Sequence, residues 1–184
     1  MTGDVGPNSR TLAALIPLGI ANHAVLTGSR VIVSLDALSR GASAFTVGVL
    51  ISLYALLPMF LSVTAGRLVD RIGARRPMLM GSVAIGISAV LPVAFPGLPA
   101  LFVAATLLGV GFMAFQLAAQ NTTGEIGGPA MRPRNFSLLA LGYSVSSFGG
   151  PLIAGFAIDH FGFRAAFATG VWEHTGASPP AGNL

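Results

Sequence analysis

The residues best suited to chemistry lie in one short segment, Gly66–Arg76, which reads Gly-Arg-Leu-Val-Asp-Arg-Ile-Gly-Ala-Arg-Arg. It holds four of the ten basic residues of the chain, and its single acid is Asp70. An ionised carboxylate only accepts hydrogen bonds, so Asp70 can bond to arginines or cap the N-terminus of a helix. Gly66 and Gly73 permit close helix approach and a tight backbone turn. These features predict a charged turn between two helices.

Five polar side chains interrupt otherwise apolar stretches. Asn22 and His23 fall near the middle of the first apolar run, and Arg30 lies nearer its far end. Gln116 and Gln120 are four residues apart, so they share one face of a helix. Polar groups at membrane depth are costly and usually face a bundle interior or a cavity. We expect these residues either to line a cavity or to bond between helices, and Arg30 has the further option of reaching outward to the interface.

The composition places these residues in a membrane. Of the 184 residues, 53% are hydrophobic and only 9% are charged, whereas a soluble domain carries about 25% charged residues. The ten arginines lie in short turns rather than in one water-facing patch, so nucleic-acid binding is not expected. With no cysteine and three widely separated histidines, no disulfide or metal site is predicted. No catalytic motif occurs, and we expect no enzyme activity.

Five apolar runs are long enough to cross a bilayer at about 1.5 Å of rise per residue. The sequence therefore predicts an all-α, polytopic membrane helix bundle. A sixth run begins at Ala165 and stops before an aberrant polar tail at 172–184, so we expect only a partial sixth helix. Residues 1–11 form a polar N-terminus, and residues 12–171 form the membrane bundle. The five predicted spans are 12–35, 45–65, 77–93, 100–121 and 136–158.

The arginines predict how the bundle is oriented. If the N-terminus lies inside, the inside segments carry seven arginines and the outside turns carry two, with Arg30 near the outer end of its span. Such an excess follows the positive-inside rule. We therefore expect a cytoplasmic N-terminus.

The charged segment has an internal copy. Gly66–Arg75 and Gly155–Arg164 both read Gly-x-x-x-Asp-x-x-Gly-x-Arg, so Asp159, Gly162 and Arg164 repeat Asp70, Gly73 and Arg75. The first copy follows the second predicted span and the other copy follows the fifth. The two turns would thus lie on opposite membrane faces, as in the inverted three-helix repeats of secondary transporters.

The charged segment resembles the signature of the major facilitator superfamily, a Gly-x-Leu-x-Asp-Arg-x-Gly-Arg-Arg-like turn between the second and third helices. The matching positions are Gly66, Leu68, Asp70, Arg71, Gly73, Arg75 and Arg76. The resemblance covers about residues 10–170 and implies the N-terminal half of that fold. It also implies that the turn latches the cytoplasmic side, with Asp70 as the latch and Arg71 and Arg75 as its partners. The alternative is that these arginines only set the topology.

A second element is similar to the Gly-Pro-x-x-Gly-Gly element of the exporter branches of that superfamily. It comprises Gly150, Pro151 and Gly155 in the fifth span, with Ala154 in place of one glycine. Generic packing of small residues is an equal alternative. Many exporters also carry an arginine before a Gly-x-Gly in the fourth helix. Here that span holds no arginine, so this route of proton coupling lacks its residue.

The resemblance implies secondary transport of a small solute by alternating access, with export favoured and a solute exchanged or cotransported with protons. It implies no cofactor, and it places the binding site near the midplane, at the depth of Asn22, His23 and Ser146–Ser147. Because the family needs two six-helix halves, we expect a truncated chain, inactive alone, in a bacterial inner membrane. One alternative is a half-size transporter that forms a homodimer. Another is a non-transporting membrane protein that modulates a full transporter.

Overall fold

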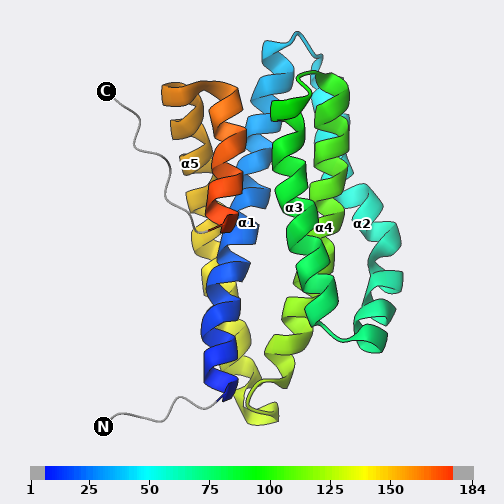
Figure 1. Cartoon of the computed structure of the whole chain (residues 1–184), viewed down its shortest axis with the longest axis vertical. Coiled ribbons are helices and arrows are strands. Elements are labelled where there is room, and N and C mark those ends of the chain that lie inside the picture. The colour runs from blue at the N-terminus through cyan, green and yellow to red at the C-terminus, as the bar shows by residue number, and fades with distance from the viewer. Residues whose placement is uncertain (1–6, 176–184) are drawn as a thin grey trace.

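The computed structural model describes the backbone of residues 7–175 and the side chains of residues 11–168. The predicted all-α fold is confirmed, because this range holds helices and no strand. The helices run antiparallel to their chain neighbours in a bundle (Figure 1). They are α1 (Pro7–Ser39), α2 (Ala44–Ile72), α3 (Arg75–Ala94), α4 (Leu98–Glu125), the short 3-10 helix η1 (Pro129–Met131) and α5 (Arg132–Thr175). Parts of the predicted N-terminus and tail, residues 1–6 and 176–184, lie outside the described residues.

Five helices within the described part of the chain are long and apolar enough to cross a membrane, as predicted. Their ends differ from the prediction. Helix α2 continues to Ile72 instead of ending near residue 65, and α5 continues past residue 158 to Thr175. Only Gly73 and Ala74 separate α2 from α3, so most of the predicted charged turn is helical. Arginine and leucine are good helix formers, and a helix can continue beyond the apolar zone where its backbone bonds remain internal.

The repeated motif adopts the same backbone conformation at its second glycine in both copies. Gly73 has φ 78° and ψ 161°, and Gly162 has φ 79° and ψ 173°. Positive φ of this size is a conformation that glycine adopts readily and other residues avoid. Gly162 divides α5 into a long arm, residues 132–161, and a short arm, residues 163–175, which folds back along the bundle. The two turns lie at opposite ends of the bundle (Figure 1), as the inverted repeat requires.

Close crossings between helix backbones hold the bundle together. A Cβ atom added to Gly28 would lie 2.9 Å from the carbonyl oxygen of Gly150, so α1 touches the long arm of α5 backbone to backbone. A Cβ on Gly81 would lie 2.5 Å from the carbonyl oxygen of Gly111, where α3 meets α4. In a bilayer, helices associate through such close packing rather than through a hydrophobic driving force. Fully buried side chains such as Phe115 complete the interior.

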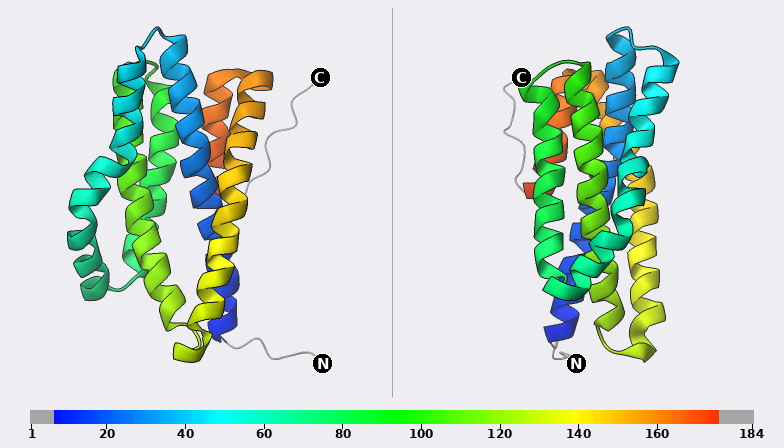
Figure 2. Two further views of the ribbon diagram at one scale, coloured as in Figure 1. Left: turned by 180° about the vertical axis from the view of Figure 1, so that it is seen from behind. Right: turned by 90° about the vertical axis from the view of Figure 1, so that its right-hand side faces the viewer.

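Helix α2 bends midway along its length and its second half leaves the bundle (Figures 1 and 2). Pro58 lies at this level, and proline removes a helical hydrogen bond and displaces the preceding carbonyl. Beyond Pro58 most large side chains are exposed, including Phe60 at 68% and Val63 at 64%. The outer face of α3 is likewise apolar, with Val83 59% exposed. In a membrane, an apolar surface of this kind can lie against lipid.

Candidate solute-binding groove

A groove of about 590 Å³ lies among α1, α2, α4 and the long arm of α5, and it is open on one side. Its volume falls within the range of about 300–1,000 Å³ that is typical of small-molecule sites. Of the described side chains, none from α3 or the short arm contributes to its lining. The polar side chains that line it are His23, Thr27, Arg30, Tyr54, Ser62, Gln116, Gln120 and Ser147.

Four of the five side chains expected to line a cavity meet in this groove, namely His23, Arg30, Gln116 and Gln120. Asn22 lies elsewhere: it is fully buried and its amide is 3.5 Å from the hydroxyl of Ser82 on α3, to which it donates. Successive residues of a helix point about 100° apart, so Asn22 and His23 face different neighbours despite their equal depth. Asn22 therefore takes the second predicted option, a bond between helices.

His23 is fixed where α1 crosses the long arm of α5. Its Nδ1 lies 2.8 Å from the hydroxyl of Ser146, and its ring stacks on Tyr143 with centroids 4.7 Å apart. The ring is also tilted against Phe112 at 5.6 Å. Next to it, the hydroxyl of Thr27 donates to the carbonyl of Ser146 at 3.0 Å. Ser146 thus orients His23 from behind, while the imidazole lines the groove.

Arg30 reaches the groove without an acidic partner. Its guanidinium carbon lies 5.5 Å from the centroid of the Tyr54 ring, in a cation–π contact. Tyr54 is buried, and its hydroxyl donates to Ser29 at 3.2 Å, which holds the ring in place. Among the described residues the one ion pair joins Arg40 to Asp36, so no carboxylate engages Arg30. Sequence reasoning missed Tyr54 because an aromatic residue in an apolar run usually marks core or lipid contact.

The charged motif lies at the end of the bundle that carries the α2–α3 turn (Figure 1). Asp70, Arg71, Arg75 and Arg76 are all exposed. Within the described part of the chain Asp70 forms no ion pair, and no side chain caps the N-terminus of α3. The expected bonds from Asp70 to Arg71 and Arg75 are therefore not formed within this bundle. The neighbouring Leu68 is 43% exposed, so the motif presents a free surface.

The sequence matches the family model described as "Major Facilitator Superfamily" over residues 8–171. This match covers most of the chain. The protein belongs to the major facilitator superfamily. A search of curated proteins gave no match. Together with the five helices able to span a bilayer, the family establishes an integral membrane protein of the transporter type.

The fifth-span element that is similar to one found in major facilitator exporters divides between two environments. A Cβ on Gly150 would collide with the hydroxyl of Thr27 and the carbonyl of Ala24, so this glycine is needed for the α1–α5 crossing. Pro151, the next residue, is half-buried. Gly155, by contrast, has no atom within 4 Å of the position a Cβ would take. The element thus combines one internal packing contact with one free surface.

The second copy of the repeated motif is bonded within this major facilitator bundle. Arg164 donates from its guanidinium to the carbonyl of Val93 at 3.4 Å, at the last turn of α3. Asp159 is exposed, and Gly162 makes the sharp turn between the arms of α5. Arg164 therefore ties the short arm to α3.

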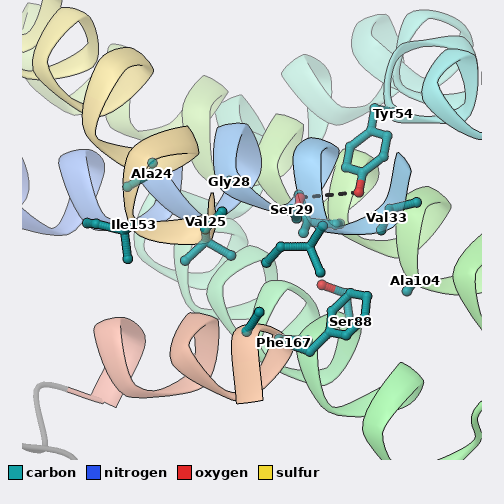
Figure 3. Close-up of a pocket in the computed structure, with 16 residues that line it drawn as sticks. Ala24, Val25, Gly28, Ser29, Val33, Tyr54, Ser88, Ala104, Ile153 and Phe167 are labelled. Carbon is teal, nitrogen blue, oxygen red and sulfur yellow. Dashed lines mark hydrogen bonds between the residues drawn. The ribbon is translucent and has the colours of Figure 1, made fainter. Parts of the chain in front are cut away.

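A second hollow, of about 30 Å³, lies in the core beneath the short arm (Figure 3). Phe167 of the short arm lines it together with residues of α1, α3 and α4. The hydroxyls of Ser29 and Ser88 also line it, but both donate to carbonyls of their own helices, at 2.9 and 2.6 Å. A volume of this size suits one water molecule rather than a solute. The groove is therefore the candidate site for transport.

Proposed function

We propose that the bundle is one half of a translocation pathway that moves a small solute by alternating access. The groove carries this proposal, because polar side chains from four helices converge on it in a molecule otherwise rich in exposed apolar side chains. In secondary transporters the substrate site lies between two repeats or bundles, near the midplane. The open side of the groove is where a second half would complete the site.

Four helical glycines support this arrangement. They have open space where a Cβ would stand, and they lie on the two helices α2 and α5: Gly48, Gly66, Gly149 and Gly155. Glycine inside a helix costs about 0.5–1 kcal/mol relative to alanine. Because no neighbour in this bundle requires these glycines, they fit a close approach by helices of a second half. Further chain or a second copy of this protein would supply that half.

We propose that the end with the α2–α3 turn faces the cytoplasm, following the arginine excess at that end. The exposed carboxylate of Asp70 would then bond to a helix of the second half and close the cytoplasmic side. Export is the direction we propose, and it rests on the Gly150-Pro151 element alone.

The test uses the absence of cysteine from the chain, which makes single-cysteine variants clean reporters. We would prepare Gln116→Cys in right-side-out and inverted membrane vesicles and measure its reaction with a membrane-impermeant methanethiosulfonate. Alternating access predicts reaction from both sides of the membrane. The control is Val83→Cys on the exposed apolar face of α3, which we expect to react from neither side. A Gln116→Cys variant that reacts from neither side, or from one side only, would refute the proposal. A covered groove would instead suit a protein that only modulates a transporter.

A further inference from the structure

The side chains that line the groove carry formal charge of one sign only, which is positive. Arg30 is the only arginine that lines it, and the lining includes no aspartate or glutamate. Of the acids whose side chains the structure describes, Asp36 is buried and paired with Arg40. The other three, Asp70, Glu125 and Asp159, are exposed residues near the ends of their helices. An arginine at membrane depth is costly unless water or a partner compensates. The groove therefore favours a negatively charged occupant.

The hydrogen-bonding groups of the groove point to the same chemistry. The hydroxyls of Thr27, Ser62 and Ser147 already donate to backbone carbonyls, at 3.0, 2.9 and 2.8 Å. Within the described bundle, no hydrogen bond engages the side chain of Arg30, Gln116 or Gln120, and all three line the groove. The uncommitted donors thus include one guanidinium and two carboxamides. A guanidinium presents its N–H groups as a planar fork that matches the oxygens of a carboxylate, sulfonate or phosphate.

Much of the remaining lining is apolar, and it includes Leu26, Met59, Phe112, Met113 and Leu117. These walls suit a hydrocarbon or aromatic body rather than an inorganic ion. The contact with Tyr54 sets the position of the guanidinium, and no hydrogen bond within the described residues occupies its N–H groups.

We infer that the groove binds an organic anion, with its acidic group on Arg30, other polar atoms against the carboxamides of Gln116 and Gln120, and the apolar body against α2 and α4. This inference rests on the proposed transport function, since it names the class of solute that the same groove takes. It excludes a permanently cationic solute, for which the lining offers no carboxylate.

The experiment measures the charge preference of the groove with a cysteine at Ser147, a groove residue whose replacement by cysteine conserves size. The chain with Ser147→Cys is reconstituted in vesicles of phosphatidylcholine. Its reaction rates with sulfonatoethyl and trimethylammonioethyl methanethiosulfonate are then compared. Each rate is divided by the rate of the same reagent with free 2-mercaptoethanol. A cleft lined by one sign of charge raises the local concentration of the opposite ion by about 10-fold or more. We therefore expect the anionic reagent to be favoured at least about tenfold.

Variants at Arg30 assign the preference to its charge. Arg30→Gln should abolish the preference, and Arg30→Lys should retain most of it, which also shows that a substituted helix still folds. Arg134→Gln, at an exposed residue outside the groove, is the matched control and should change nothing. Naphthalene-2-sulfonate should protect the cysteine, while the neutral naphthalene-2-sulfonamide should not. Arg30→Gln should weaken that protection by about tenfold or more, as expected for the loss of a charged hydrogen bond.

The outcomes separate the two proposals. If the cysteine reacts with neither reagent, the groove is closed to water, and both the transport proposal and the anion inference fail. If the cysteine reacts but favours the cation, or if Arg30→Gln changes nothing, only the anion inference is overturned. If phosphatidylglycerol in the vesicles protects the cysteine and naphthalene-2-sulfonate does not, the site takes a lipid headgroup, and the inference of a soluble anion is overturned.

Discussion

Replacing Gly109 by alanine tests whether α2 and α4 approach as closely as the structure has them. A Cβ on Gly109 would lie 2.5 Å from the carbonyl oxygen of Tyr54 and 2.9 Å from its carbonyl carbon and Cα. All three are backbone atoms, so the contact cannot be relieved by a side-chain rotation. Because ordinary contacts begin near 3.4 Å, the helices would have to separate by 3.4 less 2.5, about 0.9 Å. Overpacking of this kind typically costs about 1–3 kcal/mol.

The matched control is Gly66→Ala, which adds the same methyl group to a helix where no atom lies within 4 Å of it. Both substitutions gain the helix propensity of alanine, about 0.5–1 kcal/mol. This gain cancels when the two variants are compared. We expect Gly66→Ala to be slightly more stable than the parent. Gly109→Ala should be less stable than Gly66→Ala by about 1–3 kcal/mol, the cost of the clash alone.

The assay is unfolding of the purified single chain in mixed micelles, followed by circular dichroism as the fraction of sodium dodecyl sulfate rises. A second readout is the accessibility of Ser147→Cys in the groove, because Tyr54 holds the position of Arg30 and the clash would displace it. Equal stability of Gly109→Ala and Gly66→Ala would refute the close approach of α2 and α4. It would also remove the physical basis for the fixed contact between Tyr54 and Arg30.

Two further predictions follow from the turns and the free glycines. Gly73→Ala and Gly162→Ala should each lower the free energy of unfolding by about 1–3 kcal/mol in the same assay, because both glycines combine a positive φ with an extended ψ, which other residues avoid; a loss at only one of them would contradict the shared backbone. If a second copy supplies the other half, Gly155→Cys in membranes should cross-link to itself through a short bismaleimide, while Val83→Cys on α3 should not. Equal yields at the two positions would exclude a specific contact between copies through Gly155.

The membrane spans could be predicted from the sequence, but their ends could not. An apolar run of bilayer length has few alternatives, so the number and type of the spanning helices followed directly. Residues 66–72 read as a charged turn because they hold Arg67, Asp70 and Arg71, yet they continue α2. Polarity indicates where a chain leaves the apolar zone, whereas the end of a helix depends on a residue such as Gly73 that breaks its backbone pattern.

The sequence predicts the level in the membrane at which the groove residues lie, but not which of them face the groove. In a soluble helix the polar face reports the side that meets water, whereas in a membrane bundle the core and the lipid-facing side are both apolar. The sequence therefore placed Asn22 and His23 at one level and could not tell that one faces α3 and the other faces the groove. Tyr54 escaped prediction for a related reason. Its contact with Arg30 joins two helices, and neither local sequence indicates the other.

The two copies of the repeated motif are alike in backbone but different in bonding, and this difference supports the gate proposal. Arg164 of the second copy is bonded to the end of α3, so that turn is fixed within the bundle. In the first copy, the carboxylate of Asp70 is exposed and, within the described residues, makes no ion pair. A charged group can form and break a bond to a moving second half only if its own bundle has not already engaged it. At the Gly162 turn, Arg164 ties the backbone to α3, whereas no hydrogen bond or ion pair within the described residues ties the arginines of the α2–α3 turn in this way. We therefore place the proposed latch at the end with the α2–α3 turn.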